Sequence, residues 1–137
     1  PFTGELSLLD VNQSIDFSNI PINDTYIFPK TSELKTKIVD SRLNSSNWKL
    51  YAYIDNPLTS SNGFILENAL VFKKFNNEVI ILNSNPTLVY TGENNGGIVS
   101  FKELNWSTEK GPLLDLTNDA LEVNEEYFST INFSIEE

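Results

Sequence analysis

The 137-residue sequence contains no cysteine, no histidine and no methionine. Without cysteine the chain has no disulfide and no thiol nucleophile, and without cysteine and histidine it lacks the ligands of most zinc sites. Histidine is also the residue that most often transfers protons in enzymes, so a Ser–His–Asp triad is excluded. The sequence has no calcium-binding or phosphate-binding motif either. We therefore expect a protein that is not an enzyme and that holds no metal or other cofactor.

Basic residues are scarce as well. Nine Lys and Arg residues stand against 19 Asp and Glu residues, which gives a formal net charge of −10 at pH 7. A field of this sign repels nucleic acid and anionic lipid. The sequence also lacks a run of about 18 apolar residues, the length that a helix needs to span a bilayer. We expect neither nucleic-acid binding nor insertion into a membrane.

The sequence is rich instead in short runs in which apolar and polar residues alternate. Such runs are typical of half-buried strands, and here turn residues separate them. No segment of helical length carries a clear apolar stripe. The pattern predicts one all-β domain over residues 1–137, an antiparallel β-sandwich that is Ig-like in general architecture. The expected strands are Glu5–Leu9, Ser14–Phe17, Leu34–Val39, Trp48–Ile54, Val79–Leu82, Thr87–Tyr90, Ile98–Phe101 and Tyr127–Ile135.

Other segments are expected to be bent or irregular. Phe64–Phe72 fits a helix or a strand by periodicity, and its β-rich surroundings favour a strand with a bend at Leu66–Asn68. Ile22–Phe28 is bracketed by prolines, so it is expected to be an edge strand or an extended loop. Pro57–Gly63 and Gly92–Gly97 are expected to be loops.

Two segments far apart in the sequence carry the clearest apolar faces. In Trp48–Ile54 the even-numbered residues are apolar and the odd-numbered residues lie on the other face. In the last expected strand, Phe133 and Ile135 share a face. An apolar strand face left in water favours aggregation, so we predict one core that contains both faces, with the terminal strand inside a sheet. The residues in question are Trp48, Leu50, Phe133 and Ile135; the alternative is that they form an exposed ligand surface.

These segments also carry a resemblance to a known family. Asp40-Ser41-Arg42, a short Ser/Asn loop and Trp48-Lys49-Leu50 resemble the first signature of the WxL domain, a cell-surface domain of Gram-positive bacteria. Phe133-Ser134-Ile135 stands at the place of the second Trp-x-Leu signature, a few residues after Tyr127. The N-terminal segment agrees loosely as well, so the resemblance spans nearly the whole chain.

The resemblance implies a secreted protein on the cell wall of a Gram-positive bacterium. WxL domains are associated with non-covalent attachment to peptidoglycan or another wall polymer. They also assemble with a membrane-anchored surface protein and with other WxL-type proteins. These expectations come from the resemblance, whereas the composition indicates only an acidic, non-catalytic β domain.

The candidate binding residues are polar or aromatic. Tyr51 and Tyr53 lie on one strand face and form an aromatic ladder on which sugar rings stack, unless that face is a second buried one. Trp106 is a further candidate platform. Arg42 follows Asp40, and its planar guanidinium suits either a carboxylate of a peptide stem or a carboxylate of the protein itself.

Five of the nine basic residues lie between positions 30 and 49, namely Lys30, Lys35, Lys37, Arg42 and Lys49. We predict that binding uses this basic 30–49 region together with the Tyr51 and Tyr53 ladder. On this hypothesis Arg42→Ala weakens binding and leaves the fold intact. Two other classes of function stay open. One is an Ig-like adhesin or pilus-type subunit that binds a host protein, and the other is a carbohydrate-binding module.

Overall fold

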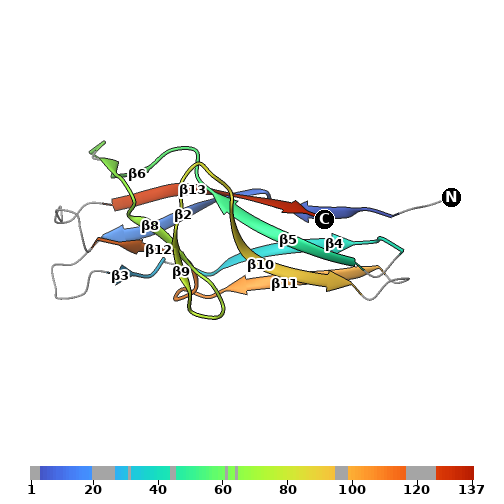
Figure 1. Ribbon diagram of the computed structural model, residues 1–137. Helices are drawn as coiled ribbons and strands as arrows, with labels where there is room; N and C mark the ends of the chain where they lie inside the picture. The colour runs from blue at the N-terminus through green and yellow to red at the C-terminus, as the bar shows by residue number, and fades with distance from the viewer. Residues whose placement is uncertain are drawn as a thin grey trace.

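The computed structural model describes residues 4–19, 27–30, 32–43, 46–60, 62–63, 65–94, 99–116 and 126–137 (Figure 1). These residues form an elongated all-β structure with several antiparallel sheets, which confirms the predicted fold class. The strands are β1 (Leu6–Leu9), β2 (Asn12–Asn19), β3 (Ile27–Phe28), β4 (Leu34–Asp40), β5 (Ser46–Tyr53), β6 (Leu58–Ser60), β7 (Ile65–Leu66), β8 (Leu70–Lys73), β9 (Val79–Ile81), β10 (Thr87–Asn94), β11 (Ser100–Trp106), β12 (Gly111–Asp115) and β13 (Glu126–Glu136).

Most of these strands follow the alternation of the sequence, but three segments differ from or refine the expectation. Leu58–Ser60 lies in the expected loop after Pro57 and pairs with both β7 and β13. β10 continues through Gly92 to Asn94, where a loop was expected. The Phe64–Phe72 segment contains β7 and β8 with a turn between them, and Asn68 adopts a positive φ of 61° there. Of the expected edge segment Ile22–Phe28, only the last two residues lie within the described part of the chain.

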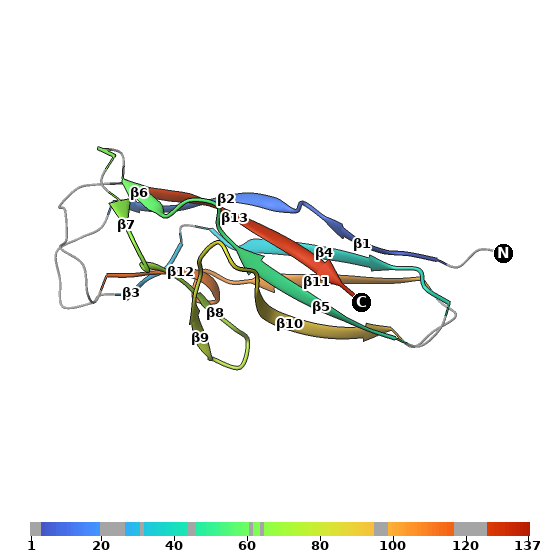
Figure 2. The same ribbon diagram turned by 45° about the horizontal axis from the view of Figure 1, so that its top comes forward.

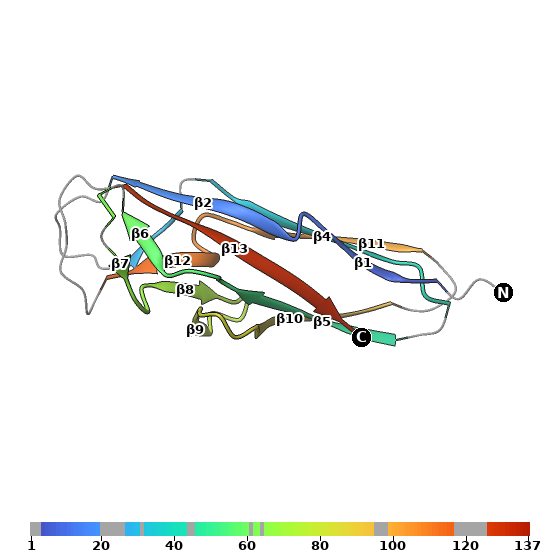
Figure 3. The same ribbon diagram turned by 90° about the horizontal axis from the view of Figure 1, so that it is seen from above.

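Two sheets form the long body of the molecule as facing layers. The first has the strand order β1-β4-β11, and the second has the order β10-β5-β13-β6-β7, with β2 also paired to β13. Figure 3 shows β1, β4 and β11 along one side and β13, β5 and β10 along the other. A third sheet, β3-β12-β8-β9, lies toward the end of the molecule away from the start of β1. The arrangement is sandwich-like, as expected; the finer prediction of Ig-like architecture stays a prediction.

The chain closes one long side of this sandwich by changing sheets at Asp10. Asp10 has a positive φ of 55°, a conformation that short polar side chains tolerate better than most. Before it β1 pairs with β4, and after it β2 pairs with β13. The backbone N–H of Phe133 also donates to the Val11 carbonyl at 2.7 Å. β1 and β2 therefore link the two layers along one edge (Figure 2).

The core lies between the layers and extends beneath the third sheet. Trp106 and Phe72 are the largest of its fully buried side chains, and their rings meet edge to face at 4.8 Å. Phe72 also meets the Phe133 ring edge to face at 6.4 Å. Phe72 lies on β8, Trp106 on β11 and Phe133 on β13, so these contacts join the third sheet to both of the other sheets. The candidate site residues stand on either face of this framework.

Candidate functional site

The two signature segments, far apart in the sequence, lie side by side. β5 and β13 pair antiparallel, with Leu50 opposite Ile135 and Ala52 opposite Phe133. Trp48, Leu50 and Phe133 are buried in the core cluster, and Ile135 packs against it. The apolar signature residues therefore build the inner face of the second sheet.

Trp48 is held against the neighbouring strand by a close approach to Gly92. Gly92 lies opposite Trp48 in the β5–β10 ladder. A Cβ atom at position 92 would lie 2.1 Å from Cζ2 of the indole, so only glycine leaves room for the ring. Tyr90 lies on the same strand as Gly92, and the centroid of its ring is 5.6 Å from that of the Trp48 ring. The close approach explains why the strand runs through a glycine that sequence reasoning assigned to a loop.

We expect Gly92→Ala to destabilise the protein by about 1–3 kcal/mol, because the indole must leave its position to admit the methyl group. Thermal melting with near-UV circular dichroism measures this loss and the changed tryptophan environment. Thr91→Ala, at the adjacent exposed position, is the matched control and should melt like the wild type. In a Trp48→Ala background the same Gly92→Ala change should cost little, because the two effects are coupled through one contact. Additive losses in the double variant would contradict the contact.

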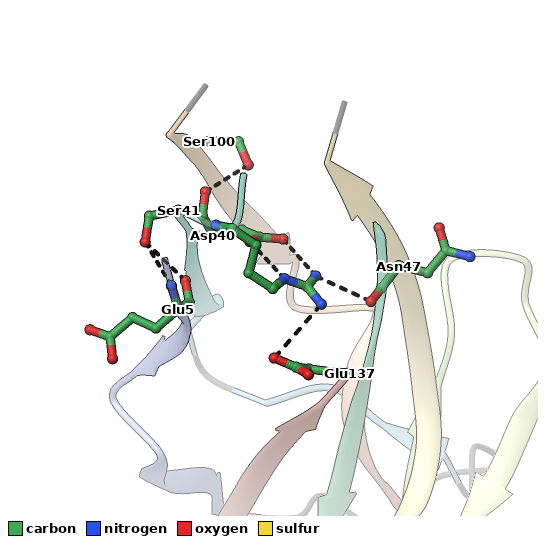
Figure 4. A network of polar contacts seen from close by, with 7 residues as sticks. Glu5, Asp40, Ser41, Asn47, Ser100 and Glu137 are labelled. Atoms are coloured by element: carbon green, nitrogen blue, oxygen red, sulfur yellow. Dashed lines mark hydrogen bonds and ion pairs between the residues drawn. The ribbon is translucent and has the colours of Figure 1, made fainter. Parts of the chain in front are cut away.

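The Asp-Ser-Arg segment forms an internal network at the end of β4 (Figure 4). Asp40 is buried, and its carboxylate accepts hydrogen bonds from Arg42 Nε at 2.9 Å, Nη2 at 2.7 Å and the backbone N–H at 3.1 Å. Arg42 Nη2 also donates to the carbonyl of Asn47 at 3.2 Å, and Nη1 lies 3.9 Å from Glu137 Oε1. The hydrogen bonds from the guanidinium hold the pKa of Asp40 below its usual range and raise the pKa of Arg42.

This geometry agrees with one of the two roles open for Arg42, the pairing with a carboxylate of the protein itself. Its side chain is only 12% exposed, and the guanidinium fork is occupied by the carboxylate of Asp40. Ser41 anchors the same turn to the N-terminal segment, because the Glu5 backbone N–H donates to Ser41 Oγ at 2.9 Å. Arg42 therefore joins the end of β4 to the start of β5, and its loss is expected to affect folding before it affects any ligand.

Lys49, Tyr51 and Tyr53 lie on the outer face of the second sheet. Lys49 is exposed, and the two tyrosines are partly exposed. The hydroxyl of Tyr51 donates to Glu136 Oε1 at 2.9 Å, and this hydrogen bond raises the pKa of the phenol. In the adjoining strand β13, Asn132, Ser134 and Glu136 stand opposite these three residues in the ladder. We call this surface the tyrosine face; it consists of Lys49, Tyr51, Tyr53, Ser134 and Glu136, together with Asn132, whose side chain is buried.

The tyrosine face combines aromatic rings with hydrogen-bonding groups of both kinds. The phenol rings offer apolar surface, and their hydroxyls donate or accept hydrogen bonds. Asn132 Nδ2 donates to Asp55 Oδ2 at 3.1 Å, which orients the amide beside Tyr53. Such a surface suits a ligand with both apolar C–H patches and hydroxyl or amide groups.

Trp106 is completely buried, so the expectation of an exposed aromatic platform at this position is wrong. Its Nε1 donates to Thr36 Oγ1 at 3.2 Å, and the Phe75 ring stacks on it at 4.0 Å with an angle of 4°. The exposed aromatic ring here is Phe75, which sequence reasoning missed. The sequence feature that could have revealed Phe75 is its position as an aromatic residue within the otherwise polar turn Lys73–Glu78.

The basic residues of the 30–49 region do not form one patch. Lys30 is buried, and its Nζ donates to the carbonyls of Ser107 and Lys110; burial lowers its pKa to about 8. Lys35 forms ion pairs with two carboxylates, because its Nζ lies 3.6 Å from Glu33 Oε1 and 3.7 Å from Glu103 Oε1. With Arg42 tied to Asp40, the cationic member of this region on the tyrosine face is Lys49.

Two classes of feature are absent from the described part of the chain. It holds no group of three or more Asp and Glu side chains arranged to bind a metal ion. Within the same residues there is no helix of the length and hydropathy needed to cross a bilayer.

Comparison with known proteins returned no match. No family model, no curated protein and no solved structure is similar to this chain at a significant level.

Proposed function

We propose that this chain is a non-catalytic cell-surface domain of the WxL type that attaches to peptidoglycan, or to another polymer of the Gram-positive cell wall. The observation that carries the proposal is the pairing of the two signature segments. β5 and β13 put their apolar residues into the core and present the tyrosine face outward. The resemblance supplies the wall as the ligand, and the tyrosine face supplies a surface of suitable chemistry.

The chemistry of peptidoglycan matches this surface in general terms. Its sugars offer C–H faces for stacking and hydroxyl and amide groups for hydrogen bonds, and its peptide stems carry carboxylates. On this proposal Tyr51 and Tyr53 contact sugar rings, and Lys49 contacts a stem carboxylate. Attachment through such groups needs no covalent step and no cofactor, in agreement with a sequence that lacks histidine and cysteine.

Tyr51→Ala is expected to weaken retention on purified, protein-free Gram-positive cell walls by about tenfold, because it removes a stacking ring from the centre of the face. Co-sedimentation across a range of wall concentrations measures the change. Tyr51→Phe keeps the ring and loses only the hydroxyl bond to Glu136, so it should retain more binding than Tyr51→Ala. Ile81→Ala, at an exposed position on β9, is the control and should bind like the wild type.

The outcome separates the remaining classes of function. Retention on bare walls that Tyr51→Ala leaves unchanged would exclude the tyrosine face. Retention only on walls that still carry their proteins would favour a membrane-anchored or other surface protein as the partner. Binding to host protein with no retention on walls would favour an adhesin or pilus-type subunit, and binding to isolated glycans alone would favour a carbohydrate-binding module.

A further inference from the structure

The long side of the sandwich opposite β1 and β2 is open. Within the described residues, β10 pairs only with β5, and β11 pairs only with β4. The two strands are consecutive and neighbouring in space (Figures 1 and 2), yet no ladder joins their described residues. Each thus has an edge whose backbone groups no strand of the described chain pairs.

A cleft of about 620 Å³ lies between these two edges. This volume is within the range of roughly 300–1,000 Å³ that is typical of ligand sites. Its walls include Tyr90 and Gly92 from β10 and Ser100 and Lys102 from β11, and Trp48 forms part of its floor. Figure 1 shows both strands along the lower side of the long body of the molecule. The cleft borders the tyrosine face and shares Lys49 with it, but neither Tyr51 nor Tyr53 lines the cleft.

Besides Asp40, the cleft is lined by three charged residues, namely Lys49, Glu93 and Lys102, and Lys102 is the one that β11 contributes. In the β4–β11 ladder Lys102 stands opposite buried Ile38, and it shares its strand face with the buried residues Leu104 and Trp106. Its side chain therefore projects from the inner face of β11 into the opening. No ion pair of the described residues includes Lys102. Asp40, which also lines the cleft, is neutralised by Arg42.

We propose that the cleft between β10 and β11 binds an extended segment of a partner protein by strand addition. The bound strand would pair its backbone with an open edge, rest an apolar side chain against Tyr90, and place a carboxylate near Lys102. β10 and β11 run antiparallel to each other, so the added strand is antiparallel to one edge and parallel to the other.

An acidic, alternating peptide suits this cleft better than a sugar. The open edges offer N–H and C=O groups at the spacing of a strand, which a peptide backbone matches. Of the aromatic residues that line the cleft, Trp48 is only 3% exposed, and Phe75 contacts the Tyr90 ring edge to face at 5.8 Å. The third, Phe101, is 59% exposed but lies on the opposite strand face from Lys102. The inference does not depend on wall attachment, since it uses a different edge of the molecule.

The test uses the full chain and capped synthetic peptides of eight residues, the length of β10. The peptides alternate valine and threonine, and one inward-facing position carries either aspartate or lysine. Binding is measured by fluorescence polarisation, and hydrogen exchange locates the protected backbone amides. We expect the aspartate peptide to bind better than the lysine peptide and to protect amides of β10 or β11.

Lys102→Glu should weaken binding of the aspartate peptide by about tenfold and reverse the preference toward the lysine peptide. Lys37→Glu is the matched control, because Lys37 lies on the outer face of the same sheet and the substitution makes the same change in net charge. It should bind like the wild type. Lys102→Glu should also retain normal binding to cell walls, whereas Tyr51→Ala should bind the peptide normally.

Several results would overturn the proposal. The first is that the peptides do not bind, and the second is that they protect amides outside β10 and β11. The third is that Lys102→Glu and Lys37→Glu have the same effect on peptide binding. Protection of β10 and β11 that appears with rising protein concentration, without peptide, would assign the cleft to a second copy of this chain. Protection by wall glycan fragments instead of peptides would assign it to a sugar.

Discussion

Arg42→Ala is expected to destabilise the protein by about 3–5 kcal/mol, because it leaves the carboxylate of Asp40 buried without its partner. The Asp40 side chain is only 2% exposed, and Arg42 supplies three of its hydrogen bonds. The backbone bond survives the substitution, but the two bonds from the guanidinium are lost. Chemical denaturation at neutral pH measures the change in the free energy of unfolding.

Two further variants control for this interpretation. Arg42→Lys keeps a positive charge but cannot reproduce the bidentate contact, so its loss should be intermediate. Asp40→Asn combined with Arg42→Ala removes the buried charge together with its partner and should recover part of the stability. An Arg42→Ala protein that unfolds like the wild type but no longer binds walls would restore the ligand role that the sequence suggested.

The stability difference between wild type and Arg42→Ala should also depend on pH. The pKa of Asp40 is lowered in the folded protein, so the unfolded chain binds a proton more readily than the folded chain at acid pH. The stabilisation from Asp40 is therefore present above the ordinary pKa of an aspartate, and it decreases as the pH falls toward the lowered value. We expect the free energies of unfolding of the wild type and of Arg42→Ala to converge below about pH 4.

Trp48→Ala should lower the free energy of unfolding by about 3–5 kcal/mol, out of roughly 5–15 kcal/mol for a domain. Trp48 is 3% exposed and fills the space between β5 and Gly92. The loss corresponds to a fall of roughly 10–20 °C in melting temperature for a chain of this size. Phe133→Ala, on the neighbouring strand, should have a similar effect, because its ring packs edge to face on Phe72.

Trp48→Phe is the control, because a smaller aromatic ring still fills much of the pocket. Wall retention is measured well below the melting temperature of each variant, so that only folded protein is compared. On this basis Trp48→Ala should bind as well as the wild type. A Trp48→Ala protein with normal melting and no wall retention would identify the indole as a ligand contact.

The amino-acid sequence by itself determined the fold class and the inner faces of the two signature strands. Alternation along Trp48–Ile54 and around Phe133 predicts burial because side chains on a strand point to opposite faces in turn. This rule is local, so it needs no knowledge of the neighbouring strands. It also separated Tyr51 and Tyr53 from the apolar face, and the structure places both on the outer surface of β5.

Only the tertiary structure decided which polar and aromatic residues are available to a ligand. Arg42 and Trp106 have the chemistry of binding residues. The guanidinium of Arg42, however, is paired with Asp40. The indole of Trp106 is hydrogen-bonded to Thr36 and stacked against Phe75. Thr36 and Phe75 lie 70 and 31 positions from Trp106 in the sequence, separations that no periodic pattern encodes. Asp40 lies only two positions from Arg42, so the sequence offered this pair as one of two alternatives and the structure decided between them.

The open edge between β10 and β11 is likewise a property of topology. Alternation predicts that β10 and β11 are strands, but it does not state which strands pair. The change of sheet at Asp10 closes one side of the sandwich, and the same arrangement leaves the other side open. The inner face of β11 continues beyond the buried core, and Lys102 stands on this continuation, at the opening. Strand pairing depends on the packing of the whole chain, and it therefore decided where a partner strand would bind.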